Sequence, residues 1–162
     1  MTGTLLYRQL SLTSWATIRS GRGSAEGVAD LLRVALLQDD DSADEALEDL
    51  ENIVVAQGNV FECAPPVVAA ILAALAGDVI PVANLAPCLD LLGRIVAGRP
   101  DPTEVALGAE DLTNRVLDEA MRGYWLLVRT ATGNDPLGAW RTASAVLTAL
   151  DAAHSRALLG VD

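Results

Sequence analysis

The stretch "DDDSADEALEDLENIVVAQGNVFECAPP" (residues 39–66) changes from strongly acidic to apolar within one short segment. Eight of its first thirteen residues are Asp or Glu, and none of the thirteen is basic. Ser42 followed by Glu45 matches a capping box, in which a hydroxyl and a carboxylate satisfy free N–H groups at a helix start. Apolar residues then recur at spacings of three and four, the period of a helix. The stretch therefore predicts an amphipathic helix over 42–57, with Gly58 as its C-terminal stop.

The segments on both sides continue the helical pattern. We expect further helices over 24–37, 65–76, 84–97, 109–131 and 137–158, because apolar residues recur there at helical spacing and "RPDP" (99–102) and "TGNDP" (132–136) break the pattern. The helix over 65–76 is almost wholly apolar and opens with two prolines, which a first helical turn tolerates. Such a helix is expected to be buried on several sides. Period-two alternation is too short anywhere to predict a strand.

These helices form three consecutive hairpins, over about 24–57, 65–97 and 109–158. A short helix near 14–19 precedes them, within an N-terminal cap over residues 1–20. Hairpins stacked side by side make an α-solenoid, and about three repeats are the minimum for stability. The expected fold is therefore a single all-α domain over residues 1–162, built as a short solenoid.

Composition agrees with a helical fold and limits the classes of partner. Hydrophobic residues make up 51% and aromatic residues only 4%, with Ala and Leu dominant, which favours helices over a β-sandwich. The net charge is −11, and residues 39–78 contain ten acidic residues and no basic residue. Such a segment repels nucleic acid phosphates and anionic membranes. The charge favours a basic protein partner, or no partner.

The sequence carries few signals of processing or of a particular compartment. Two cysteines make neither a disulfide framework nor a zinc site by themselves. The N-terminus lacks the basic start and long apolar run of a signal peptide, and the longest apolar run is too short to span a bilayer. We therefore expect a cytoplasmic protein with reduced thiols. The oligomeric state is left open.

Several short motifs occur through residues 14–98: Trp15, Gly23 to Ala25, Asn52 to Val54, Gln57 to Gly58, Val60 to Glu62 and Ala64 to Pro65. With these motifs, this part of the chain resembles a family of small bacterial HEAT-like repeat proteins. The resemblance implies HEAT-like helical hairpins and a non-catalytic binding scaffold. Some proteins of this kind look like immunity proteins or regulators encoded beside toxins. Likeness of fold is an association and does not establish the function.

The acidic face of the helix over 42–57 is the first candidate site. The candidate partner-binding residues there are Asp41, Asp44, Glu45, Glu48 and Glu51. Charge of one sign steers the approach of an oppositely charged protein and raises its association rate. A calcium loop is excluded, because the required Gly is missing and Ala43 replaces a ligand. The alternative interpretation is a solvated face that keeps the protein in solution.

A row of arginines in the helix over 109–131 is the second candidate site. Arg115, Arg122 and Arg129 recur every seven residues, and Trp125 lies between the last two. Arg122, Trp125 and Arg129 are candidate partner-binding residues, because Trp and Arg are enriched at interface hot spots. Trp125 is also placed to stack with either arginine. A surface face laced with salt bridges is the alternative. Gly123 indicates close approach of a neighbouring helix.

The loop "QGNVFECAPP" (57–66) joins two of the expected hairpins. Gln57, Asn59 and Glu62 are expected to bond loop backbone, and Phe61 to anchor the loop to the core. The alternative is a ridge that binds a partner, since inter-repeat loops often line the binding face of a solenoid.

The sequence predicts no catalytic residue, metal ligand or cofactor. Cys63 and Cys88 lie among apolar residues, which favours packed side chains over nucleophiles. His154 is the single histidine and has no Cys or Ser motif beside it. "GRGSAEG" (21–27) lacks the strand and lysine of a phosphate-binding loop.

The expected function is therefore a non-catalytic protein-binding scaffold. Its most specific form is an immunity-type protein whose acidic surface blocks a basic effector or toxin. The alternative is a structural or regulatory HEAT-like adaptor whose acidic face serves only solubility.

Overall fold

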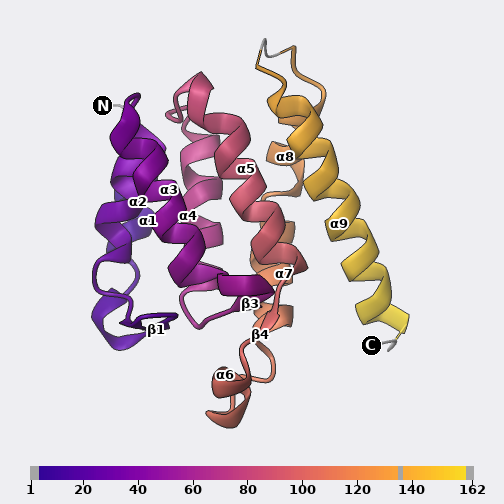
Figure 1. Cartoon of the computed structure of the whole chain (residues 1–162). Helices are drawn as coiled ribbons and strands as arrows, with labels where there is room; N and C mark the ends of the chain where they lie inside the picture. Colours follow the sequence, from indigo (N-terminus) through magenta and orange to yellow (C-terminus); the bar gives the residue numbers. More distant parts are fainter. Residues whose placement is uncertain (1–3, 135–136, 160–162) are drawn as a thin grey trace.

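The computed structural model describes residues 4–134 and 137–159, and this part of the chain is mostly helical (Figure 1). It contains nine α-helices and four strands of two residues each. The helices are α1 (Thr4–Ser11), α2 (Val28–Leu37), α3 (Asp41–Val54), α4 (Ala64–Ala76), α5 (Val82–Ala97), α6 (Pro102–Ala106), α7 (Leu112–Arg122), α8 (Tyr124–Ala131) and α9 (Ala139–Leu159). The strands are β1 (Arg19–Ser20), β2 (Gly23–Ser24), β3 (Asn59–Val60) and β4 (Arg99–Pro100). The prediction of an all-α fold is confirmed.

The long helices lie in two rows. In one row α1 packs against α4 and α4 against α7, and in the other α3 packs against α5 and α5 against α9. Figure 1 shows the second row in front of the first, with α2 beside α3 at the N-terminal side. Helix α1 joins the first row through Leu6 and Leu10, which are both buried. Of the expected hairpins, α2 with α3 and α8 with α9 pack closely, whereas α4 makes its main contacts with α1 and α7 rather than with α5.

Helix α4 is the centre of the core. Ten of its thirteen residues are buried, and it contacts α1, α2, α5, α7 and α8. This confirms the prediction that the apolar segment over 65–76 is covered on several sides. Its C-terminal turn is closed by Asp78, which has a positive φ of 50°. The N–H of Asp78 bonds the carbonyl of Leu75 at 3.2 Å, and the N–H of Val79 bonds that of Ala74 at 3.2 Å, as in a Schellman motif.

The start of α3 differs from the predicted capping box. The helix begins at Asp41, and the carboxylate of Asp40 accepts a hydrogen bond from the Ser42 N–H at 3.0 Å. A carboxylate caps a helix at least as well as a hydroxyl and also suits the positive end of the helix dipole. Ser42 therefore lies inside the helix. The other end is also earlier than expected, at Val54, and Gly58 (φ 81°) closes a separate turn over Ala56–Gly58.

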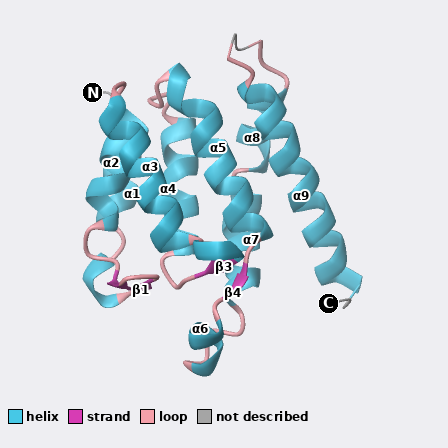
Figure 2. Cartoon of the chain, in the orientation of Figure 1, coloured by secondary structure: helices cyan, strands magenta, loops and turns pink. Residues whose placement is uncertain are grey.

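Short strands occur where no strand was predicted. β1 and β2 pair antiparallel, so α2 begins at Val28 rather than near residue 24, and the helix expected near 14–19 is only a 3-10 turn over Trp15–Thr17. β3 and β4 pair in parallel, with Asn59 opposite Arg99. Two-residue strands are too short to produce an alternating pattern. Figure 2 shows these strands and α6 at one end of the helices.

The connection between α2 and α5 depends on a buried amide. The side-chain amide of Asn84 donates to the carbonyls of Ala35 at 3.1 Å and Gln38 at 2.6 Å. These carbonyls lie at the C-terminal end of α2, where a helix leaves carbonyl groups without internal partners. Asn84 therefore satisfies the end of one helix from inside another.

The single helix predicted over 109–131 is two helices, α7 and α8, separated at Gly123. A Cβ placed on Gly123 would lie 2.2 Å from Cδ2 of Leu72 in α4. The expected close approach of a neighbouring helix is therefore confirmed, and it coincides with the break. The short helix α6, before α7, is separated from it by Gly108, which has a φ of 88°.

Substitution of Gly123 tests this approach. Gly123→Ala is expected to destabilise the protein by about 1–3 kcal/mol, because overpacking against Leu72 outweighs the better helix propensity of Ala. The free energy of unfolding in urea measures the effect. Gly27→Ala is the matched control, because a Cβ there meets nothing within 4 Å. A Gly123→Ala variant as stable as the wild type would show that α4 and α7 do not meet so closely.

Candidate interaction surfaces

Helix α3 presents the largest group of unpaired carboxylates. Its inner face buries Ala43, Ala46, Leu50, Ile53 and Val54. Its outer face exposes Asp41, Asp44, Glu45 and Glu48. None of these four makes an ion pair within the part of the chain that the structure describes. The packing of α3 on α2 and α5 thus holds four like charges on one side of a single helix.

Glu51, the fifth acidic residue predicted to bind a partner, is already engaged. Its carboxylate forms an ion pair with Arg94 of α5, whose Nε also donates to Asp90 at 2.8 Å. The hydrogen bond to Asp90 and the charge of Glu51 raise the pKa of Arg94. Nearby, Asp49 pairs with Arg22 at 3.2 Å. The unpaired charge is therefore concentrated in the first two turns of α3, and Glu51 lies at its edge.

The predicted row of Arg122, Trp125 and Arg129 is divided by the break at Gly123. Arg122 pairs with Glu119 at 2.7 Å. Arg129 donates to Asp78 at 2.9 Å and to the carbonyl of Leu75 at 2.9 Å, so it ties α8 to the end of α4. The predicted salt bridge along the helix is thus confirmed for Arg122, whereas Arg129 pairs with a carboxylate outside its own helix.

Trp125 is exposed, like Arg122 and Arg129, with 78% of its surface accessible. Its ring meets Tyr124 edge to face, with the centroids 5.9 Å apart. The cation–π contact that the structure records in its described residues joins Arg141 to Trp140, at 5.1 Å. The expected stacking of Trp125 with Arg122 or Arg129 is therefore wrong, because the two arginines are held by carboxylates instead.

A buried ion pair joins the loops at one end of the helices. Arg19 in β1 donates through Nη2 to Oε2 of Glu104 at 2.7 Å and through Nε to Oε1 at 3.3 Å. Glu104 lies in α6 and is only 2% exposed, whereas Arg19 is partly exposed. Glu62 completes the group, since its Oε2 lies 3.2 Å from Nη1 of Arg19. The hydrogen bond to Glu104 raises the pKa of Arg19. We call these three residues the Arg19 clasp.

Backbone hydrogen bonds surround the Arg19 clasp. Glu62 Oε2 accepts from the N–H of Arg19 at 2.9 Å, and the carbonyl of Arg19 accepts from the N–H of Cys63 at 3.0 Å. The expectation that Glu62 bonds loop backbone is confirmed, and so is the packing of Phe61 against the core. The same expectation is wrong for Gln57 and Asn59, whose side chains form no hydrogen bond with the described residues, and Gln57 has a positive φ of 53°.

Sequence reasoning did not find Glu104. The residue stands three positions after Asp101, which caps α6 by accepting from the Thr103 N–H at 2.9 Å. This spacing is that of a capping box, so the pattern indicates an exposed carboxylate that bonds its own helix. Instead the side chain turns inward to Arg19, 85 positions earlier in the chain. A carboxylate and an arginine so far apart leave no local sequence signal.

Neither cysteine has the surroundings of a nucleophile. Both are buried, and burial raises the pKa of Cys63 and of Cys88 to about 12. His154 is exposed on α9. Within the described ranges no cluster of three or more His, Cys, Asp or Glu side chains is arranged to hold a metal ion. No helix in those ranges is long and apolar enough to cross a membrane.

Removal of the charge on Glu104 tests the Arg19 clasp. Glu104→Gln is expected to lower the free energy of unfolding by about 1–3 kcal/mol, because the buried side chain loses the charge that strengthens its hydrogen bonds to Arg19. Urea denaturation measures the loss, and Glu110→Gln, at an exposed carboxylate, is the control. In the Glu104→Gln variant, the further change Arg19→Gln is expected to lower the free energy of unfolding by less than Arg19→Gln does in the wild type. Strictly additive losses would show that the two residues do not act as a pair.

Thiol labelling tests the burial of the cysteines. With a pKa of about 12, only about one thiol in ten thousand is ionised at pH 8, and the thiolate is the reactive form. Both cysteines are therefore expected to react with Ellman's reagent only when the protein is unfolded in urea. An introduced surface thiol, Ala76→Cys, should react at once. Rapid labelling of the native wild type would contradict the packing of α4 and α5.

No protein-family model, curated protein or solved structure matches the chain. Its function is therefore inferred from its own surfaces.

Proposed function

We propose that the chain is a non-catalytic scaffold that binds a basic protein through the outer face of α3. The observation that carries the proposal is the set of four exposed carboxylates, at Asp41, Asp44, Glu45 and Glu48, for which the described residues provide no cation. In its most specific form the protein is of the immunity type and blocks a basic effector or toxin.

The arrangement of the charge on α3 favours a role in binding over a role in solubility alone. Charges that serve solubility alone are most effective when dispersed, whereas these four occupy one face of one helix. Each exposed pair with a partner's Lys or Arg contributes little affinity, about 0.2–1 kcal/mol. Together, several such pairs steer the encounter and exclude acidic competitors. An inhibitor that must reach its target quickly benefits from such steering.

The helical rows support the scaffold part of the proposal. The helices stack side by side in two rows, α1–α4–α7 and α3–α5–α9, which supports a helical scaffold, although α1 takes the place in the first row that the expected hairpins give to α2. In such an array α3 belongs to an outer row, so its polar side is open to a partner. The N-terminal half of α3 also follows directly on the exposed Asp39 and Asp40, which extend the acidic surface.

Affinity capture from the native host with matched baits tests this function. One bait is the wild type, and the second carries Asp44→Asn, Glu45→Gln and Glu48→Gln. The control bait carries Glu26→Gln, Glu110→Gln and Asp151→Asn, which remove the same charge at exposed positions elsewhere. The wild type and the control are expected to retain one basic protein that the α3 variant loses. That protein should elute as salt rises from about 0.1 M to about 1 M, where the Debye length falls from roughly 10 to 3 Å.

Other results of the affinity capture would lead to different conclusions. A partner retained equally by all three baits, with no dependence on salt, would refute binding through α3. A partner lost equally from both variants would mean that net charge matters rather than its position. Recovery of no partner would favour the alternative adaptor, in which the acidic face serves only solubility.

A further inference from the structure

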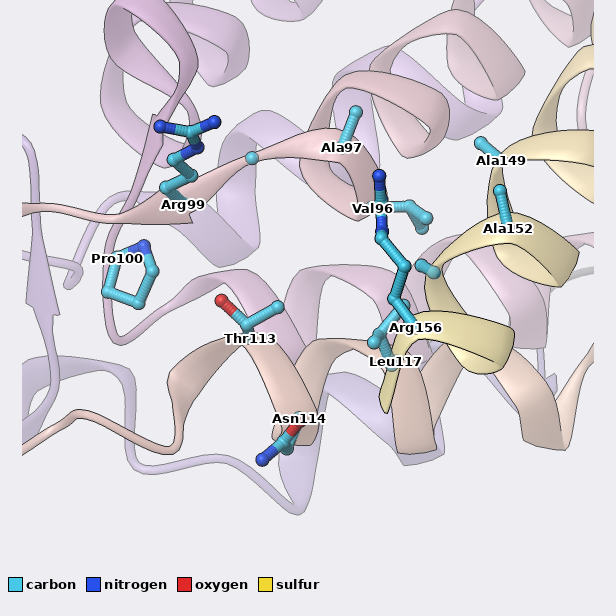
Figure 3. Close-up of a pocket in the computed structure, with 12 residues that line it drawn as sticks. Val96, Ala97, Arg99, Pro100, Thr113, Asn114, Leu117, Ala149, Ala152 and Arg156 are labelled. Carbon is cyan, nitrogen blue, oxygen red and sulfur yellow. The ribbon is translucent and has the colours of Figure 1, made fainter. Parts of the chain in front are cut away.

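A groove opens between the two rows near the C-terminal end of α5. Its volume is about 900 Å³, and it is lined by the end of α5, by β4, by the first turns of α7 and by α9. Residues of α5, α7 and α9 surround it, as Figure 3 shows in close-up. The fold thus forms a groove from three separate parts of the chain, over 96–100, 113–117 and 149–156.

The groove is positively charged in a negatively charged protein. Among the described residues, its lining includes Arg99 of β4 and Arg156 of α9 and no carboxylate. Both arginines are exposed, and neither forms an ion pair with any other described residue. In Figure 3 the side chain of Arg156 extends from α9 toward the end of α5, near Val96 and Ala97. The groove therefore has two guanidinium groups whose carboxylate partner is missing.

Three other hollows on the surface provide a comparison. Each contains arginine, but each also contains an acidic residue: Arg19 with Glu104, Arg94 with Glu51, and Arg115 and Arg122 with Asp118 and Glu119. The chain has twice as many acidic as basic residues. Among these four hollows, the groove between α5, α7 and α9 is the one whose described lining has arginine without a carboxylate.

The walls of the groove leave room for a peptide. They include the small side chains of Ala97, Ala149, Ala152 and Ala153, together with Gly98. Thr113 and Asn114 add hydrogen-bonding groups at the edge formed by α7. A peptide with short side chains can lie against such a surface while its carboxylates reach the guanidinium groups. Arg binds carboxylates with paired N–H donors, which gives direction as well as charge.

We propose that this groove binds an extended acidic peptide segment of a protein partner. A nucleic acid fits less well, because a phosphate backbone continues beyond two arginines into the field of a protein with a net charge of −11. A peptide can alternate carboxylates with small neutral residues, whereas a nucleic acid carries a charge on every phosphate. The site is separate from the acidic face of α3 and takes the opposite charge, so it does not depend on the proposed function.

Titration followed by 15N NMR tests the groove with a defined probe. The probe is a blocked decapeptide of alternating Ala and Glu, and the control replaces every Glu with Gln. The Glu peptide is expected to shift backbone signals over 96–100, 113–117 and 149–156 together with the Nε–H signals of Arg99 and Arg156. The Gln peptide should leave them unchanged. No shift with millimolar Glu peptide, or shifts spread over other surfaces, would overturn the proposal.

Matched variants distinguish the contribution of the arginine charges to peptide binding from that of the shape of the groove. Arg99→Gln combined with Arg156→Gln should weaken binding about tenfold, which is two exposed ion pairs of roughly 0.7 kcal/mol each. Arg8→Gln removes an exposed arginine on α1 and should have no effect. Ala152→Trp fills the groove at an exposed position and should block the peptide with both arginines in place. Unchanged binding to the double variant, or tighter binding of an oligothymidylate than of the Glu peptide, would refute an acidic-peptide site.

Discussion

The pairing of Arg19 with the buried carboxylate of Glu104 is the constraint on which the loop end of the molecule depends. A carboxylate removed from water is costly unless a cation and hydrogen-bond donors surround it. Glu104 meets that requirement with a residue from the first quarter of the chain, and Glu62 adds a contact from a third segment. Three connections that leave different helices are thereby fixed to one another. β3 and β4 pair beside them, and the N–H of Asp101 bonds the carbonyl of Val60 at 3.0 Å.

The molecule also carries two surfaces of opposite charge. The early turns of α3 concentrate negative charge, whereas the groove beside the end of α5 is lined by Arg99 and Arg156 without any carboxylate. Helix α5 lies between the two surfaces. Its Arg94 neutralises the edge of the acidic face, and its Ala97 and Gly98 line the groove. Charge is thus separated across one helix, although the molecule as a whole is strongly negative.

The comparison of sequence with structure shows which features are local. The apolar segment over 65–76 was predicted correctly, because continuous hydrophobicity over that length requires burial on several sides. The exposed helix face that bears Asp44, Glu45 and Glu48 can also be predicted, from the helical spacing of the apolar residues and the positions of the acidic residues. The cap was assigned to Ser42 instead of Asp40 because both are good capping residues and their spacing does not choose between them. Gly123 indicated a close neighbour, but only Leu72 across the interface explains why the helix is interrupted.

Features that several distant segments form together could not be predicted from the sequence. The spacing of Glu104 from Asp101 fits a helix cap, and the true partner, Arg19, is known only once β1 and α6 are side by side. The groove is likewise formed by segments that are far apart in the sequence. Arg99 and Arg156 are ordinary surface arginines in the sequence, and the lack of carboxylates around them emerges only from the meeting of α5, α7 and α9.

The central position of α4 has a consequence for the chain before it folds. A segment as apolar as 64–76 is prone to intermolecular β-pairing while it is exposed, and neighbouring charges and prolines oppose that pairing. Pro65 and Pro66 stand at its start, Glu62 precedes it, and Asp78 follows it. The acidic run from residue 39 adds electrostatic repulsion between unfolded chains. The same negative charge that marks the native surface therefore protects the most aggregation-prone helix until its neighbours cover it.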